Sequence, residues 1–152
     1  MKYVCEVEIN IPVEKVVDFW SDEINFSNWQ DGFISIELLE GNWNVEGSKS
    51  KILFKNGKQK MELIETVISN NLPFSKKALY EHIHMSNTQL SRFEKISDII
   101  CLETSSIIIE RLDICVMHAQ RKVKIGHLTM AQDDLALRKP NFIELLKEGK
   151  SH

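Results

Sequence analysis

The first part of the chain alternates between apolar and polar side chains and then changes to a helical spacing. Apolar residues stand at every second position from Tyr3 to Ile9, which predicts a half-buried strand over residues 3–9. After Pro12 the apolar residues recur at intervals of three and four, at Val13, Val16, Val17 and Trp20. This spacing predicts a short amphipathic helix over residues 13–20, with the proline at its start.

A second helical turn is expected over residues 23–30, which carry Phe26 and Trp29. Alternating apolar positions then predict further strands over residues 34–38, 49–55, 61–67, 77–85, 88–96 and 98–109. Asn56-Gly57 predicts a type I′ hairpin turn, because both central residues of that turn need a positive φ. Ser86-Asn87 predicts another turn. The short connections indicate an antiparallel meander, since parallel strands need long crossovers.

One face of such a sheet needs a helix to cover it, and only the chain after residue 110 remains for that role. Residues 110–127 show no clean period, whereas residues 128–138 permit a helix. Pro140 should kink or split this helix, because proline costs about 3 kcal/mol inside one. Asn141 is suited to cap a final helical piece that ends at Gly149.

Composition limits the class of protein. The 152 residues are 43% hydrophobic and 27% charged, which is typical of a single globular domain spanning residues 1–152. The net charge of −3 and the pI of about 6.0 argue against nucleic-acid binding. The longest apolar runs are short, so no integral membrane contact is expected. No export signal stands at the N-terminus, so we expect a cytoplasmic monomer or homodimer.

The cysteines and lysines offer little catalytic chemistry. Cys5, Cys101 and Cys115 form no Cys-x-x-Cys pair, so we expect buried, inert thiols and neither a metal site nor a cofactor. Five lysines fall in a stretch without acids. They are consistent with a phosphate-binding strip or, more simply, with the solvated face of a hairpin. The five are Lys49, Lys51, Lys55, Lys58 and Lys60.

Several short motifs within residues 1–96 resemble the START/Bet v 1-like superfamily, in the branch described as SRPBCC or polyketide cyclase/dehydrase-like. The resemblance covers about two-thirds of the chain, and the sequence departs from the family pattern after about residue 97. The motifs that carry it are Tyr3–Val7, Pro12–Val16, Asn28-Trp29 with Gly32, Gly47–Lys51, Phe54–Lys58, Glu62–Thr66, Leu72-Pro73 and Arg92–Glu94.

This resemblance implies an α+β helix-grip fold. A curved antiparallel sheet of about six or seven strands, with two short helices after the first strand, would wrap around a C-terminal helix and leave a cavity between them. Family members bind lipids, polyketides or other apolar molecules. We therefore expect binding of an apolar small molecule. Two alternatives are a cyclase/dehydratase-type enzyme using the same cavity and a protein-partner-binding domain that uses the lysine hairpin.

The expected cavity wall is apolar, because dry apolar gaps accept apolar ligands. Each candidate lining residue also suits plain core packing: Trp20, Trp29, Ile36, Ile52, Phe54, Met61, Leu63, Tyr80 and His82. His82 and His84 are predicted on one face of a strand, about 7 Å apart. With Tyr80 they are candidates for acid–base chemistry, or simply two histidines near a sheet edge.

Overall fold

The computed structural model describes residues 2–30, 32–98 and 100–112, most of which form one antiparallel sheet. The three helices come between the first two strands: α1 (Val13–Ser21), the 3-10 helix η1 (Glu23–Asn25) and α2 (Phe26–Trp29). The strands are β1 (Lys2–Ile9), β2 (Phe33–Glu40), β3 (Lys49–Asn56), β4 (Gln59–Asn71), β5 (Ser75–His82), β6 (Met85–Ser97) and β7 (Ile100–Leu112).

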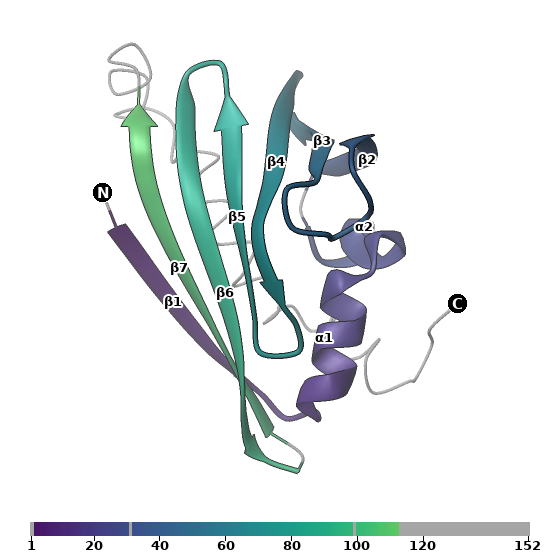
Figure 1. Ribbon diagram of the computed structural model, residues 1–152, viewed down its shortest axis with the longest axis vertical. Coiled ribbons are helices and arrows are strands. Elements are labelled where there is room, and N and C mark those ends of the chain that lie inside the picture. The colour runs from purple at the N-terminus through teal and green to yellow at the C-terminus, as the bar shows by residue number, and fades with distance from the viewer. Residues whose placement is uncertain (1, 31, 99, 113–152) are drawn as a thin grey trace.

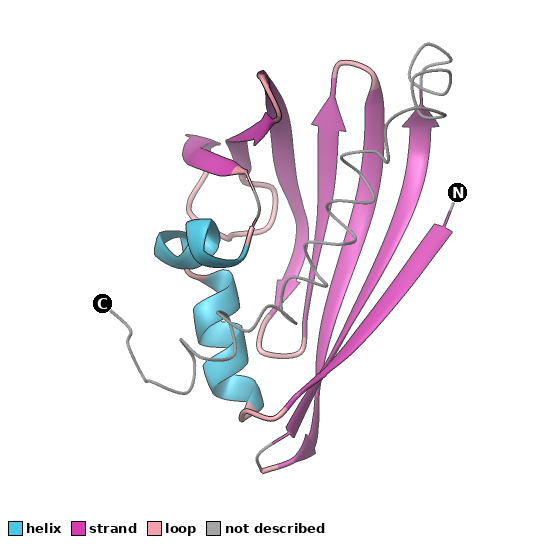
Figure 2. Ribbon diagram, turned by 180° about the vertical axis from the view of Figure 1, so that it is seen from behind, coloured by secondary structure: helices cyan, strands magenta, loops and turns pink. Residues whose placement is uncertain are grey.

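The seven strands described here follow the order β1-β7-β6-β5-β4-β3-β2. Strands β2 to β7 form a meander of hairpins, and β1 pairs with β7 at the far edge. Figure 1 shows a strongly curved sheet with the helices beside it, and Figure 2 shows the same arrangement from behind. The predicted α+β architecture, with two short helices after the first strand, is confirmed.

Helix α1 packs against β6 and β7 through the apolar stripe that its sequence predicted. Val13, Val16, Val17 and Trp20 are all buried, and Pro12 precedes the first helical residue. The Asp22 side chain then accepts a hydrogen bond of 3.1 Å from the backbone nitrogen of Ile24, which begins η1. This turn redirects the chain so that α2 can add Phe26 and Trp29 to the same core.

Two predicted turns are shifted. The β3–β4 turn consists of Gly57 and Lys58, because Asn56 still pairs with Gln59. Gly57 has φ 61°, and positive φ at the first central position only is the type II′ pattern, so the type I′ prediction was wrong. The β5–β6 turn lies at residues 83–84, and the predicted turn at Ser86-Asn87 was also wrong.

The expected C-terminal helix, with Pro140 and the piece from Asn141 to Gly149, lies outside the described residues, as does Cys115. Within the described chain, no helix is long and apolar enough to span a bilayer. Cys101 is fully buried, and burial together with the nearby Glu103 charge raises the pKa of its thiol to about 11. This thiol therefore stays protonated, as expected for an inert cysteine.

Candidate functional site

The inner face of the sheet, defined as the face that packs against α1, carries an unexpected number of buried polar side chains. An apolar wall was predicted, but polar side chains interrupt it. Because direct cross-strand partners share a face, the pairing places one polar strip across β3 to β7. Its buried members are Ser50, Glu65, Lys76, Asn87, Gln89, Ser91, Glu103 and Ser105.

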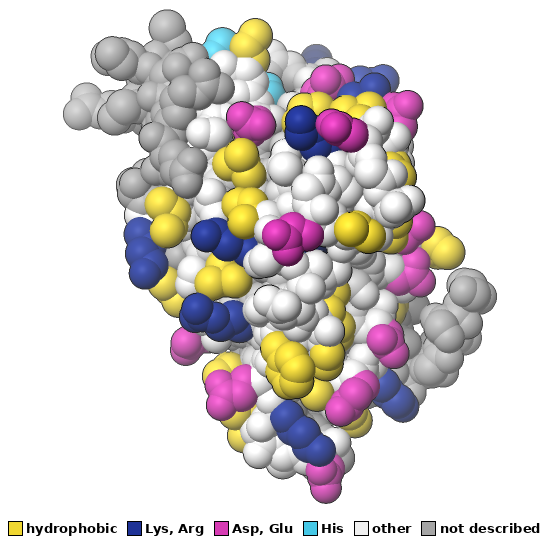
Figure 3. Space-filling model, in the orientation of Figure 1, with side chains coloured by type: hydrophobic (Ala, Val, Ile, Leu, Met, Phe, Trp, Pro, Cys, Tyr) yellow, Lys and Arg dark blue, Asp and Glu magenta, His cyan; other side chains and the backbone are white. Residues whose placement is uncertain are grey.

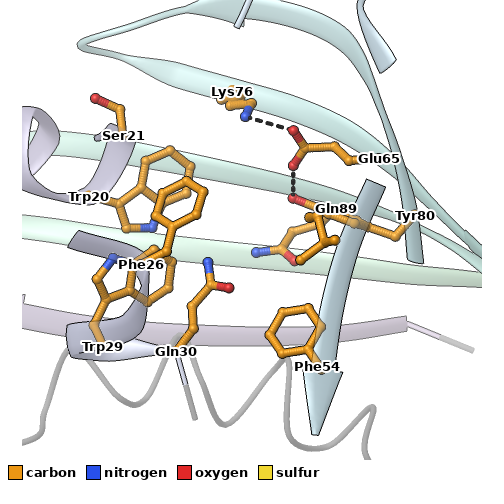
Figure 4. A pocket seen from close by; sticks show the side chains of 11 residues that line it. Trp20, Ser21, Phe26, Trp29, Gln30, Phe54, Glu65, Lys76, Tyr80 and Gln89 are labelled. Carbon is orange, nitrogen blue, oxygen red and sulfur yellow. Dashed lines mark hydrogen bonds and ion pairs between the residues drawn. The ribbon is translucent and has the colours of Figure 1, made fainter. Parts of the chain in front are cut away.

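A cavity lies between this face and the helices (Figure 4). The empty space of this cavity is about 550 Å³, a volume that includes its opening to solvent. The centres of water-sized molecules fit into only about 40 Å³ of it. The enclosed part is thus small, and a ligand must be small or must move side chains. The lining residues are Trp20, Ser21, Phe26, Trp29, Gln30, Ile52, Phe54, Glu65, Lys76, Tyr80 and Gln89.

The helical side of the cavity is built from aromatic rings. The indoles of Trp20 and Trp29 are stacked with their centroids 6.1 Å apart, and Phe26 meets Trp29 edge to face at 5.8 Å. Trp20 also packs edge to face on Phe93 of β6 at 5.1 Å, which ties α1 to the sheet. These contacts hold the rings together as an aromatic wall.

The opposite side of the cavity is a charged network of three side chains. The Lys76 ammonium lies 3.3 Å from one carboxylate oxygen of Glu65, and the Tyr80 hydroxyl donates to the other at 2.6 Å. Lys76 and Glu65 are each only 7% exposed, so the pair is shielded from solvent. Strands β4 and β5 position all three, since Glu65 and Tyr80 are direct cross-strand partners.

Asn44, on the loop between β2 and β3, completes the environment of Lys76. Its side-chain oxygen accepts a hydrogen bond of 2.8 Å from the Lys76 ammonium. The backbone oxygen of Asn44 accepts from Asn70 at 2.7 Å, which anchors the loop to β4. Asn44 has φ 57°, a left-handed conformation that asparagine tolerates better than most residues. Lys76 therefore uses two of its three hydrogens on protein groups.

Several buried polar atoms beside the cavity have no hydrogen-bond partner in the part of the chain that the structure describes. They are Nε1 of Trp20, Nε1 of Trp29 and Oε1 of Gln30. On the polar strip nearby, the side-chain nitrogen and oxygen of Asn87 also have no hydrogen-bond partner among the described residues. Leaving such groups unpaired costs free energy, and the great majority of buried polar groups in proteins are paired.

Eight of the nine predicted lining residues fall into two groups. Trp20, Trp29, Ile52, Phe54 and Tyr80 line the cavity. Ile36, Met61 and Leu63 instead belong to the adjacent apolar cluster around Ile52 and Phe54. Contact of any of these residues with a ligand stays a prediction.

Apart from Tyr80, the polar members of the site were missed. Glu65 and Lys76 were overlooked because charged residues are rarely buried. Both lie at inner positions of the same alternation that correctly placed Leu63 and Tyr80 inside. The sequence did offer a sign of this, because each charged residue stands at a position where the strand alternation places a buried side chain.

His82 lies away from the cavity. His84 stands in the β5–β6 turn rather than on the strand, and the two rings are 5.6 Å apart. The predicted arrangement of both histidines on one strand face was therefore wrong. Partial burial, and to a lesser degree the nearby His84, lowers the pKa of His82 below its usual 6.5. Among the described residues, no cluster of three His, Cys, Asp or Glu could hold a metal ion.

The lysine hairpin is largely a solvated surface. Lys51 lies 3.0 Å from Glu37 and Lys49 lies 3.4 Å from Glu40, both across the β2–β3 pair. Lys and Arg side chains on the face shown in Figure 3 are interspersed with Asp and Glu rather than gathered together. The arrangement favours the simpler of the two interpretations drawn from the sequence.

No family model and no curated protein sequence matches the chain, but many solved structures share its fold. A conserved protein from Geobacillus kaustophilus is 17% identical, with a TM-score of 0.75 over 98% of this chain and 97% of that one. A START superfamily protein from Mycobacterium smegmatis is 13% identical, with a TM-score of 0.64 over 90% and 97%. The START-like fold expected from the sequence is confirmed.

A third similar structure is norcoclaurine synthase from Thalictrum flavum in complex with dopamine and hydroxybenzaldehyde. It is 16% identical, with a TM-score of 0.67 over 100% of this chain and 89% of that chain. Likeness at this level of identity establishes the shared fold, and the activity of this chain has to be argued from its own residues.

Proposed function

We propose that this protein binds a small molecule in the cavity between the helices and the inner face of the sheet. The ligand has a planar apolar body, which packs among Trp20, Phe26 and Phe54, and an oxygen that accepts a hydrogen bond from Lys76. The observation that carries the proposal is the buried Lys76, which lines the cavity and has one ammonium hydrogen left after Glu65 and Asn44.

Stability alone does not explain why this charged group is buried. A buried ion pair is often no more stabilising than well-packed apolar side chains of similar volume, because both charges lose their hydration. Ligand sites, in contrast, commonly combine apolar and aromatic walls with a few polar groups that orient the ligand. The arrangement therefore narrows the expected apolar ligand to one that also has a polar end.

Shared fold gives this proposal modest support. The norcoclaurine synthase structure is described with dopamine and hydroxybenzaldehyde, which are small aromatic molecules with polar substituents. Another structure of the same fold is described as an aromatase/cyclase from Streptomyces, at 8% identity and a TM-score of 0.70. Both descriptions are compatible with a cavity for a small planar molecule.

Acetophenone is a suitable probe, because it has one aromatic ring and one carbonyl acceptor. We expect saturable binding with a Kd of about 1 mM or weaker, as befits so few atoms, measured by NMR shifts of the amides of Tyr80 and Gln89. The double variant Lys76→Met/Glu65→Gln removes both charges and should weaken binding about tenfold. Lys60→Met, on the exposed hairpin, serves as the control. Absence of saturable shifts, or equal binding by the double variant, would refute the proposal.

A second candidate is proton transfer in the same cavity, favoured by the short bond between Tyr80 and Glu65. Glu65 could take a proton from the carbon beside a carbonyl while Lys76 stabilises the enolate oxygen. In D₂O this chemistry would exchange the methyl protons of acetophenone for deuterium faster than buffer does. Exchange at the buffer rate despite binding would leave a binding protein only.

A further inference from the structure

The helical side of the cavity presents an unusual set of unpaired polar atoms. Trp20 and Trp29 each offer an indole N–H, and Gln30 offers a carbonyl oxygen. The two indole side chains are 8% and 5% exposed, so bulk water does not reach their nitrogens. Figure 4 shows the two indoles and Gln30 grouped together, across the cavity from Glu65 and Tyr80.

Core packing does not account for this set. Aromatic rings surround the two indoles, and a ring is at best a weak acceptor for an N–H group. Each unpaired buried donor or acceptor costs about 1–3 kcal/mol. Three such atoms on residues that line one cavity are consistent with groups held ready for a ligand.

The numbers of donors and acceptors match a hydroxyl better than a carbonyl, a carboxylate or an ammonium. A hydroxyl has one O–H donor and two acceptor lone pairs, which complement two N–H donors and one carbonyl acceptor. A carbonyl or carboxylate could use the indoles but would leave the Gln30 oxygen unpaired. An ammonium could use Gln30 but would leave both indoles unpaired.

We propose that this helical side is a hydroxyl-binding subsite formed by Trp20, Trp29 and Gln30, and that the ligand is a hydroxylated aromatic molecule. The inference rests on the proposed function, because the acceptor oxygen at Lys76 orients the other end of the same ligand. Since the indole nitrogens are closed to solvent, the hydroxyl enters by displacing the side chains around them slightly.

The test compares two probes that differ in one group. 4-Hydroxyacetophenone has the hydroxyl, whereas 4-methylacetophenone replaces it with a methyl of similar size. We expect the hydroxyl probe to bind at least tenfold more tightly to the wild-type protein, because three hydrogen bonds are lost with the methyl. In Gln30→Met this preference should fall by about three- to tenfold. Gln59→Met, at the exposed start of β4, should retain it.

Indole NMR signals give an independent readout. The chain has three tryptophans, and Trp43 does not line the cavity, so its signal is an internal reference. The hydroxyl probe should shift the indole N–H signals of Trp20 and Trp29 downfield beyond the shift that the methyl probe causes, with little change at Trp43.

The outcomes separate the two proposals. Equal binding of both probes, with equal indole shifts, would overturn the hydroxyl subsite and leave the small-molecule site intact. Failure of both probes to bind would overturn both proposals. A preference for the hydroxyl probe that persists unchanged in Gln30→Met would also contradict the subsite as drawn.

Discussion

Replacing Gly32 with alanine is expected to lower the free energy of unfolding by about 3 kcal/mol or more. Gly32 has φ 77°, and a Cβ at this position would collide with the backbone carbonyl oxygen of Lys55 on β3. The collision cannot be relieved by a side-chain rotation, so it adds to the backbone strain of a left-handed alanine. Urea unfolding, with equal m-values for both proteins, measures the effect.

Gly57→Ala is the matched control. Gly57 has a similar φ of 61°, but an added Cβ there meets nothing within 4 Å. This variant should lose only about 1–2 kcal/mol, the cost of the left-handed conformation by itself. Similar losses in the two variants would show that the close approach to β3 has no energetic weight.

The contact between Gly32 and β3 also helps to position residues that line the cavity. The backbone nitrogen of Lys55 donates to the Gly32 oxygen at 2.7 Å, so the chain directly after α2 is held against β3. Trp29 and Gln30 lie just before this point and line the cavity. We therefore expect any Gly32→Ala protein that still folds to have a disturbed helical side of the site.

The second large effect is expected from Lys76→Met, which should cost about 3–5 kcal/mol because it leaves the Glu65 carboxylate buried without its cation. Adding Glu65→Gln to this variant should restore most of the loss, since the amide is neutral and can still accept from Tyr80. Thermal or urea unfolding of the two single variants and the double variant measures the coupling between the two side chains.

An exposed ion pair provides the comparison. Lys49 and Glu40 lie 3.4 Å apart, but their side chains are 47% and 69% exposed. Lys49→Met should change the free energy of unfolding by less than about 1 kcal/mol, as is usual at the surface. A Lys76→Met effect no larger than this would mean that solvent reaches the Glu65 carboxylate, contrary to its burial in the structure.

Together, the buried charges and the unpaired indoles describe one cavity with two polar ends. The sheet supplies the charged end through Glu65, Lys76 and Tyr80, and the helices supply the neutral end through Trp20, Trp29 and Gln30. Aromatic side chains separate the two ends. Such a site is costly to the folded protein when empty, and a ligand of matching chemistry would offset that cost on binding.

Local patterns were sufficient to predict most of the secondary structure. The spacing from Val13 to Trp20 predicted α1, and the alternation around Ile52 and Leu63 predicted both strands and the face that is buried. These predictions succeed because side-chain direction in a helix or strand follows from the backbone period. The turn at Gly57-Lys58 was placed one residue early, because Asn-Gly and Gly-X turns share the same glycine.

The character of the site depended on contacts between residues far apart in the chain. As single residues in the sequence, Glu65 and Lys76 have the character of solvated charges, and only the pairing of β4 with β5 brings the two side chains together in a buried ion pair. His82 and His84 were predicted on one face of a strand, but β5 ends at His82 and His84 lies in the β5–β6 turn.

The hydrophobic period of the chain was thus enough to establish strands, helices and the buried face, since that period is a local property. Which polar side chains share a dry cavity depends on strand register and on the path of α1 and α2 across the sheet. Those are properties of the assembled fold, because the free energy of a buried charge depends on the partners that the fold supplies.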